Sequence, residues 1–192
     1  RIWGMFLKTV HHPPENAIAS TRPHLNLRNK SSMRKKVLFV CLGNICRSPA
    51  AEGVFRQMVR NAGLETVIHI DSAGTGAWHV GDAPDARMIH HASLRGYDLR
   101  DLEARQLQSP EDFTNHDLIL TMDQANLRHV LALDTKREFH GKVRPLTSFC
   151  KIHVSQEVPD PYYRDQDGFE HVLDLIVDAC RELLEHLKKD LQ

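Results

Sequence analysis

The sequence predicts an α/β fold: a single doubly wound domain in which helices cover both faces of a four-stranded parallel sheet. Short apolar runs alternate along the chain with segments whose apolar residues recur at helical spacing. Such runs are typical of parallel strands, because both faces of these strands are buried. From residue 36 to residue 192 the chain shows no internal repeat and no linker, so one domain accounts for this region.

Four apolar runs are the expected strands, and turn-forming residues bound them. The second run is followed by Asp71-Ser72-Ala73-Gly74, whose small and polar residues suit a turn. The fourth run is shorter and weaker than the others. The predicted strands cover residues 36–40, 66–70, 117–122 and 142–146.

The first helix is predicted over residues 50–62, directly after the first strand and its loop. Ser48 is suited to cap this helix and Pro49 to its first position, while Gly63 is suited to end it.

Three more helices are expected further along the chain. One covers residues 84–95 and is stopped by Gly96, and another covers residues 124–131. The last is the clearest, because apolar residues from Phe169 to Leu187 recur at steps of three and four.

Residues 1–35 are expected to form a basic, disordered N-terminal extension. Residues 1–36 hold eight Lys and Arg and one Glu, whereas the rest of the chain holds 17 basic and 24 acidic residues, a formal charge of −7. Three prolines and the lack of periodicity are typical of unfolded segments. Met33, just before the first strand, is interpreted as the natural start. The alternative is that the Arg-bearing, acid-poor extension is an organelle transit peptide.

Composition excludes several classes of function. Lys plus Arg and Asp plus Glu both number 25 in 192 residues, so nothing indicates nucleic acid as a partner. No stretch approaches the apolar length of a membrane span. The four cysteines are few and unevenly spaced, which argues against a disulfide framework. We therefore expect a reducing compartment, the cytoplasm, and no membrane partner.

Residues 37–49 read V-L-F-V-C-L-G-N-I-C-R-S-P, an apolar strand that runs into Cys41, with Arg47 six positions later. The loop after this strand lies at the carboxyl edge of the sheet, where open α/β folds bind ligands. Backbone N–H groups and the next helix N-terminus favour an anion there. These groups and a nearby guanidinium favour the thiolate form of a cysteine.

Other residues of the same loop suit a phosphate site. The guanidinium of Arg47 can hold two phosphate oxygens at once. Gly43 and Asn44 permit the unusual backbone angles that let a loop curl, and Ser48 places a hydroxyl near the sulfur. The loop therefore predicts attack by the sulfur of Cys41 on a phosphate ester.

Simpler interpretations exist for these residues. A cysteine and an arginine at this spacing arise often by chance as a structural thiol and a surface charge. Cys41 and Cys46 could hold zinc only with further ligands, and no Cys or His pair follows at zinc-site spacing. The neighbouring His90 and His91 are interpreted as solvated, because adjacent residues do not share a helix face. We expect no metal and no cofactor.

The loop and several later segments resemble the low-molecular-weight protein tyrosine phosphatase family. V-C-L-G-N-I-C-R-S-P resembles the signature of that family, and D-S-A-G at 71–74 resembles the sequence after its second strand. A-R-Q-L at 104–107 and T-M-D at 121–123 match smaller motifs, and D-P-Y-Y at 160–163 matches its general-acid loop. These segments follow the family order and cover residues 36–192, whereas residues 1–35 have no counterpart.

The resemblance implies a role for each matched residue. Cys41 is the implied nucleophile, Arg47 binds phosphate and stabilises the transition state, and Asp160 is the general acid and base. Ser48 is expected to stabilise the departing thiolate. Asn44 is expected to hold the loop with the help of Ser72. The expected phosphate- and ring-binding set is completed by the backbone of Leu42, Gly43, Asn44, Ile45 and Cys46 and by the side chains of Trp78, Tyr162 and Tyr163.

Two features of the loop leave alternatives open. Cys46 is either a small buried residue or a redox partner that traps oxidised Cys41 as a reversible disulfide. Ile45 bears on the substrate, because the protein arginine phosphatases of the family have threonine there. An isoleucine methyl is expected to crowd a branched guanidinium phosphate and to leave room for a flat phenyl ring.

Hydrolysis of phosphotyrosine is therefore the predicted activity, with three alternatives. Arsenate reductase needs a further cysteine pair after the third strand, and residues 121–133 contain none. Protein arginine phosphatase is the second alternative, and a non-catalytic phosphate-binding module is the third. The expected partners are phosphotyrosine-containing proteins, with a cognate tyrosine kinase as a candidate. We expect a monomer or weak dimer.

Overall fold

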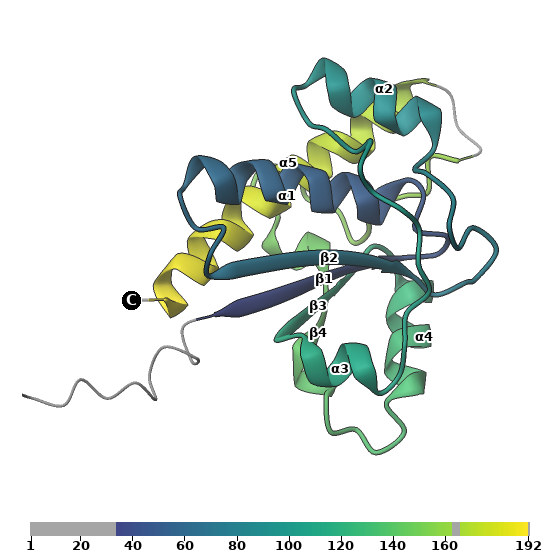
Figure 1. Cartoon of the computed structure of the whole chain (residues 1–192), viewed down its shortest axis with the longest axis vertical. Helices are drawn as coiled ribbons and strands as arrows, with labels where there is room; N and C mark the ends of the chain where they lie inside the picture. Colours follow the sequence, from purple (N-terminus) through teal and green to yellow (C-terminus); the bar gives the residue numbers. More distant parts are fainter. Residues whose placement is uncertain (1–33, 163–165, 192) are drawn as a thin grey trace, which may run out of the picture.

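A parallel sheet of four strands forms the centre of the computed structural model, which describes residues 34–162 and 166–191 (Figure 1). The strands are arranged in the order β2-β1-β3-β4, as expected for a doubly wound sheet. Their bounds are Lys35–Cys41 for β1, Ile68–Gly74 for β2, Leu118–Thr121 for β3 and Val143–Pro145 for β4.

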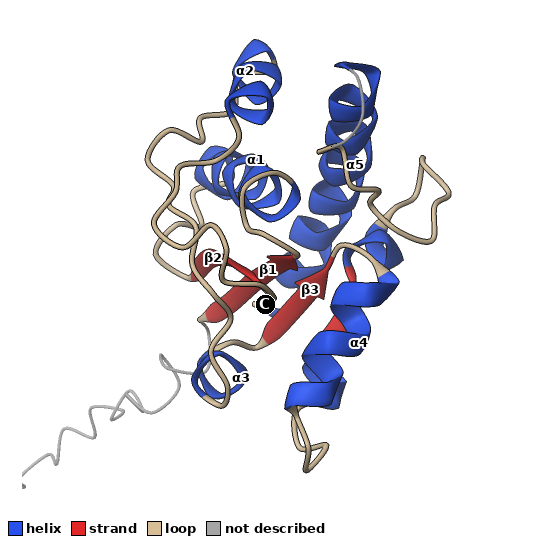
Figure 2. Cartoon of the chain, turned by 90° about the vertical axis from the view of Figure 1, so that its right-hand side faces the viewer, coloured by secondary structure: helices blue, strands red, loops and turns tan. Residues whose placement is uncertain are grey.

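Helices cover both faces of this sheet, which confirms the predicted fold class (Figures 1 and 2). One face carries α1 (Arg47–Asn61), α2 (Ala86–Leu94) and α5 (Gln166–Asp190). The other face carries α3 (Glu111–Asn115) and α4 (Gln124–Leu133). Two short 3₁₀ helices, His140–Lys142 and Leu146–Phe149, flank β4.

β1 is the central strand, and its side chains build both halves of the core. Val37 and Phe39 belong to the apolar cluster under α1 and α5, while Leu38 and Val40 belong to the cluster under α3 and α4. All four side chains are fully buried, because successive residues of a strand point to opposite faces and each face is covered.

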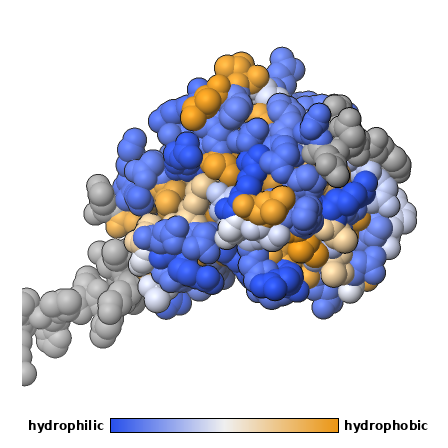
Figure 3. Space-filling view, turned by 90° about the horizontal axis from the view of Figure 1, so that it is seen from above, coloured by the Kyte–Doolittle hydropathy of each residue, from blue (hydrophilic) through white to orange (hydrophobic). Residues whose placement is uncertain are grey.

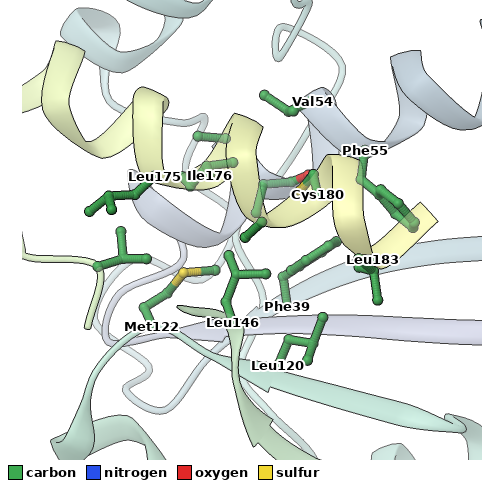
Figure 4. Packing of buried hydrophobic residues seen from close by; sticks show 14 of the residues in the cluster. Phe39, Val54, Phe55, Leu120, Met122, Leu146, Leu175, Ile176, Cys180 and Leu183 are labelled. Atoms are coloured by element: carbon green, nitrogen blue, oxygen red, sulfur yellow. The ribbon is translucent and has the colours of Figure 1, made fainter. Parts of the chain in front are cut away.

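The larger cluster joins β1 to the two long helices, as Figure 4 shows. Phe39 meets Phe55 of α1 edge to face, with 5.9 Å between ring centroids. Ile176, Cys180 and Leu183 reach this core from α5, as their helical spacing predicts. This packing anchors α1, and with it the loop that precedes α1.

β1 pairs with β2 on one side and with β3 on the other, so the chain reverses its winding direction around β1. Val40 lies opposite Ala73 of β2 and Thr121 of β3. Open α/β sheets bind ligands at such a switch point, in the crevice outside the carboxyl ends of the strands. Cys41, the last residue of β1, stands at this position.

Two predicted boundaries near the loop are wrong. Asp71 to Gly74 are not a turn but the second half of β2, because the backbone of these residues pairs with Leu38 to Cys41 of β1. Ser48 is not the cap of the first helix: α1 already begins at Arg47, and no side chain caps it. The Ser48 hydroxyl turns instead to the sulfur of Cys41, at 3.0 Å.

Other differences concern single elements. The five-residue α3 was not predicted, because it is too short to show helical periodicity. The interpretation of His91 as solvated is wrong, since the residue is buried, stacks on Phe169 and bonds to Glu170 of α5 at 2.5 Å.

The predicted glycine stops of the helices are confirmed, with left-handed φ values of +67° at Gly63 and +83° at Gly96.

On the face shown in Figure 3, hydrophobic residues lie in separate groups among hydrophilic ones. None of the helices in the described part of the chain has the length and apolar character to cross a membrane. The predicted extension lies outside the described residues except for Arg34 and Lys35, and its disorder stays a prediction.

Candidate active site

The candidate site is the loop between β1 and α1. Cys41 ends the strand and Arg47 opens the helix, so the five residues between them form a tight connection. Both end residues are buried, Cys41 with 3% and Arg47 with 2% of its surface exposed. An arginine buried to this degree requires partners for its charge.

Backbone hydrogen bonds from neighbouring segments hold this loop. The N–H of Thr75 donates to the carbonyl of Cys41 at 2.9 Å, and the N–H of Asp85 donates to Ile45 at 2.7 Å. Gly74 at the end of β2 lets the loop approach closely, since a Cβ there would lie 2.9 Å from the carbonyl oxygen of Leu42. The end of β2 thus shapes the loop, as does the start of α2.

Asn44 is the centre of the polar contacts behind the loop. It takes the left-handed conformation, with φ of 56°, whereas Gly43 does not. Its side-chain Nδ2 donates to Ser48 Oγ and to Ser72 Oγ, both at 2.9 Å. The predicted support of the loop by Asn44 and Ser72 is therefore present as contacts. Asn44 is 1% exposed, so these bonds are shielded from water.

The sulfur of Cys41 has two polar neighbours. The backbone N–H of Asn44 donates to Sγ at 3.2 Å, and Ser48 Oγ lies 3.0 Å from Sγ. Donors directed at a sulfur stabilise its thiolate form.

Arg47 binds two carboxylates from distant parts of the chain. Its Nη1 donates to Asp123 Oδ2 at 2.6 Å and to the carbonyl of Val158 at 3.2 Å. Its Nη2 donates to Asp160 Oδ2 at 2.7 Å. Burial acts to lower the pKa of the Arg47 guanidinium, but Cys41, Asp160 and Asp123 outweigh it, so the pKa lies above its ordinary value.

Asp160 lies on the segment between the 3₁₀ helix Leu146–Phe149 and α5. Its Oδ1 accepts from the backbone N–H of Tyr162 at 3.1 Å, which orients the carboxylate. Arg87 of α2 donates to the carbonyl of Tyr162 at 3.2 Å and stands 5.3 Å from the centre of its ring. The segment is thereby tied to α2. Tyr163 lies outside the described residues.

A pocket of about 310 Å³ opens over the loop. The aromatic residues Trp78 and Tyr162 line it and are 75% and 38% exposed, and His79 lies beside Trp78. The structure therefore brings most of the predicted site residues into one pocket. Its lining consists of Cys41, Leu42, Gly43, Ile45, Cys46, Arg47, Trp78, His79, Asp160 and Tyr162, while Asn44, Ser48 and Ser72 lie behind the loop.

Cys46 lacks the low thiol pKa that is typical of a nucleophilic cysteine. Burial first, and then the negative charge of Asp85, raise the pKa of the Cys46 thiol far above its ordinary value. Cys46 therefore stays protonated at neutral pH. Cys41 and Cys46 are both free thiols, and a redox partnership between them stays a prediction.

Four residues of the site were not predicted as such. Asp123 follows β3 at the carboxyl edge of the sheet, and this position was a usable signal because side chains that follow neighbouring parallel strands converge. Arg87 and His79 gave no comparable signal, because tertiary packing alone brings them to the site. Glu52 lies on α1 soon after the loop, but its contact there, a bond from Ser72 Oγ to Glu52 Oε2 at 2.6 Å, depends on the packing of α1 against β2.

In the described part of the chain, no three His, Cys, Asp or Glu side chains are grouped to hold a metal ion. The pocket brings together a thiol, a guanidinium and a carboxyl group, carried by Cys41, Arg47 and Asp160. A nucleophile, an anion clamp and a proton donor are the groups that phosphate-ester hydrolysis through a covalent intermediate requires.

Known proteins are similar to this chain over most of its length. A Synechocystis protein named as a low molecular weight protein-tyrosine-phosphatase is 51% identical over 156 residues, which cover 81% of this chain and 98% of that protein. The crystal structure of a protein tyrosine phosphatase from Entamoeba histolytica is 40% identical, with a TM-score of 0.76 over 81% of this chain and 97% of its own.

A Drosophila arginine phosphatase has the same fold. Its crystal structure is 31% identical and has a TM-score of 0.73, over 80% of this chain and 98% of its own. The family model for low molecular weight phosphotyrosine protein phosphatases matches residues 36–192, which include the loop, the pocket and the Asp160 segment. The chain therefore belongs to the low molecular weight phosphotyrosine protein phosphatase family.

Proposed function

We propose that the protein is a tyrosine phosphatase that hydrolyses phosphotyrosine in proteins through a phosphocysteine intermediate. One observation carries the proposal. The sulfur of Cys41, which accepts from the backbone N–H of Asn44 and lies 3.0 Å from Ser48 Oγ, shares a pocket with the guanidinium of Arg47 and the carboxyl group of Asp160.

In the first step, the thiolate of Cys41 attacks phosphorus and the bond from phosphorus to the tyrosyl oxygen breaks. Asp160 donates its proton to that oxygen, so the leaving group departs as neutral phenol. Arg47 and the backbone N–H groups of the loop hold the remaining phosphate oxygens and stabilise their charge. The product of this step is phosphocysteine.

The ion pair between Arg47 and Asp160 fits this step. Asp160 and a bound phosphate group use the same guanidinium, that of Arg47. In the structure, Arg47 Nη2 donates to Asp160 Oδ2 at 2.7 Å. A bound phosphate competes for that nitrogen and releases Asp160 from the pair. The released carboxyl group can then face the tyrosyl oxygen of the substrate.

In the second step, water attacks the phosphorus of phosphocysteine and the bond from sulfur to phosphorus breaks. Asp160, now ionised, takes a proton from the water, and inorganic phosphate is released. The sulfur leaves as a thiolate, and the hydroxyl of Ser48 at 3.0 Å stabilises its charge. The step consumes one water molecule and restores the starting enzyme.

An aromatic substrate fits the walls of the pocket. The rings of Trp78 and Tyr162 line it, and Ile45 places a branched side chain beside Cys46. A flat phenyl ring stacks on such walls, whereas a phosphorylated guanidinium needs polar partners for its N–H groups. Hydrolysis of phosphoarginine remains the second candidate, because a structural neighbour is an arginine phosphatase.

The setting of the enzyme is proposed from the same features. Its substrates are phosphotyrosine-containing proteins, with a cognate tyrosine kinase among them, and it acts as a monomer or weak dimer. Four free thiols fit a reducing compartment, and we propose the cytoplasm.

The test compares release of phosphate from matched phosphotyrosine and phosphoarginine peptides by the wild type and Cys41→Ser, with a chelator present. We expect release from phosphotyrosine that disappears in the variant, while inorganic phosphate still binds to it. Release mainly from phosphoarginine would keep the mechanism and replace the substrate. No release by the wild type, with retained phosphate binding, would show a binding module instead.

A further inference from the structure

Arg87 connects α2 to residues 158–162, the acid segment, which carries Asp160. Its Nη1 donates to the backbone carbonyl of Tyr162 at 3.2 Å. Its guanidinium stands 5.3 Å from the centre of the Tyr162 ring and 4.9 Å from the centre of the Phe169 ring on α5. Because a guanidinium is attracted to the face of an aromatic ring, the two rings and the hydrogen bond hold this side chain in one place.

Asp85, the residue that caps α2, orients this guanidinium. Its two carboxylate oxygens accept from Arg87 Nε at 3.0 Å and from Arg87 Nη2 at 2.7 Å. This two-point contact fixes the plane of the guanidinium and leaves Nη1 directed at Tyr162. Since the N–H of Asp85 bonds to the carbonyl of Ile45, the connection runs from the loop after β1 to the acid segment.

The same local pair occurs a second time in the chain. Asp98 and Arg100 are also two residues apart, and Arg100 donates to Asp98 through Nε at 2.8 Å and through Nη2 at 2.7 Å. Within the described residues, the guanidinium of Arg100 bonds to Asp98 alone, and its side chain is 77% exposed. The pair therefore forms from local geometry, and the contact with Tyr162 is what distinguishes Arg87.

The acid segment is held on both sides of Asp160. On the first side, the N–H of Val158 donates to the carbonyl of Met122, directly after β3, at 2.7 Å. On the second side, Arg87 binds the carbonyl of Tyr162, whose own N–H donates to Asp160 Oδ1 at 3.1 Å. The contact of Arg87 is thus one hydrogen bond away from the carboxyl group.

Binding of a phosphate group removes a third contact, the one that Asp160 makes itself. Arg47 Nη2 donates to Asp160 Oδ2 at 2.7 Å, and in the proposed mechanism a phosphate oxygen takes that nitrogen. The carboxyl group is needed at the leaving oxygen at the moment when its own ion pair is lost. Arg87 does not line the pocket, so its bond to Tyr162 does not compete with phosphate.

We propose that Arg87 is a positioning residue for the general acid. It keeps Tyr162 in place, and the N–H of Tyr162 keeps the carboxyl group of Asp160 directed at the leaving oxygen after phosphate has displaced it from Arg47. The inference rests on the proposed function, because it assigns Arg87 to the step in which Asp160 donates its proton.

Loss of the Arg87 guanidinium has a selective consequence. With substrate bound, the second side of the acid segment moves over a wider range, and the carboxyl group is within reach of the leaving oxygen in fewer complexes. The rate falls in proportion to that fraction, but only for substrates whose leaving group needs a proton. Attack by Cys41 and phosphate binding by Arg47 are unaffected.

The first experiment compares kcat/KM for phenyl phosphate, a poor leaving group, with kcat/KM for 4-nitrophenyl phosphate, a good one. Arg87→Met removes the donors and keeps an apolar chain of similar length against the rings, and Arg100→Met is the matched control. We expect Arg87→Met to slow phenyl phosphate about fivefold more than 4-nitrophenyl phosphate, and the control to leave the ratio unchanged. A change in the pocket wall at Tyr162 would slow both substrates alike, so the ratio isolates the acid.

A second background tests the route through Asp160. In Asp160→Ala, the added Arg87→Met change is expected to alter the same ratio less than twofold, because the group that Arg87 positions is already absent. A full effect in that background would overturn the proposal, as would equal slowing of both substrates or an equal effect of Arg100→Met. Circular dichroism verifies that each variant is folded.

A measurement without turnover separates this proposal from the proposed function. NMR follows exchange of the Tyr162 backbone N–H with solvent in the full chain saturated with inorganic phosphate. We expect exchange about fivefold faster in Arg87→Met than in the wild type, and unchanged in Arg100→Met. An unchanged rate in Arg87→Met would overturn the positioning role even if the enzyme hydrolyses phosphotyrosine. If the wild type shows no turnover while this rate responds as described, the proposed function fails and the positioning of the carboxyl group stands.

Discussion

Replacing Glu52 by glutamine is expected to change how the stability of the protein depends on pH. Burial disfavours the ionised form of Glu52 in the folded protein, and the bonds from Ser72 and Arg56 offset this only in part. Its folded pKa is about 6, compared with 4.5 for an unperturbed side chain. Glutamine occupies the same volume and does not titrate in this range.

The size and sign of the expected change in the free energy of unfolding follow from this difference in pKa. Between pH 4.5 and 6 the folded state of the wild type binds more protons at Glu52 than the unfolded state does. Its contribution to the free energy of unfolding is therefore present at low pH and is lost as pH rises through about 6. A rise of about 1.5 pKa units corresponds to about 2 kcal/mol.

Urea unfolding at a series of pH values from 4 to 7.5 measures this contribution. The quantity of interest is the unfolding free energy of the wild type minus that of Glu52→Gln, because titrating groups that do not interact with Glu52 cancel in the difference. We expect this difference to fall by about 2 kcal/mol across the series, mainly between pH 4.5 and 6. A constant difference, or one that rises with pH, would refute the reasoning about the buried carboxylate.

Three further predictions concern the pocket. Asp160→Ala is expected to slow aryl phosphates with poor leaving groups at least tenfold more than those with good ones, since only the former need a proton donor. Arg47→Lys is expected to lower kcat/KM about 100-fold or more without unfolding, because an ammonium cannot provide two parallel N–H donors. Gly76→Ala is expected to raise KM for aryl phosphates several-fold, since its Cβ would lie 1.9 Å from the ring of Trp78. Steady-state kinetics and thermal unfolding check all three.

Each of these predictions has an outcome that contradicts it. Equal slowing of all leaving groups would remove Asp160 from the acid role. A loss of less than tenfold in Arg47→Lys would show that a point charge suffices. The prediction for Gly76→Ala requires that the side chain of Trp78, a residue that is 75% exposed, moves aside for the added Cβ. A stability loss above about 2 kcal/mol would show that it does not.

The pattern of apolar residues along the chain was sufficient to predict the fold class. Local signals were not sufficient to predict where the helices and strands begin and end. Apolar runs and helical periodicity predicted the sheet and the long helix α5, because these patterns record which faces are buried. The end of β2 was missed because Ser72 and Gly74 resemble turn residues, and only pairing with β1 makes them a strand. The start of α1 was missed for a similar reason, since Ser48 bonds to Cys41 rather than to a backbone N–H.

By itself, the sequence determined the residues of the loop and the helix and strand that flank it, because a buried strand, a turn and a helix follow one another within few residues. Cys41 and Arg47 could be paired on that basis alone. Only the tertiary structure decided what meets this loop from elsewhere. Asp123 reaches Arg47 across 76 residues, because neighbouring parallel strands bring their carboxyl ends together. Asp160 reaches Arg47 across 113 residues, on a segment that is tied to the end of β3 by the bond from the N–H of Val158 to the carbonyl of Met122. The link from Ser72 to Glu52 depends on the packing of α1 against β2, which no local pattern records.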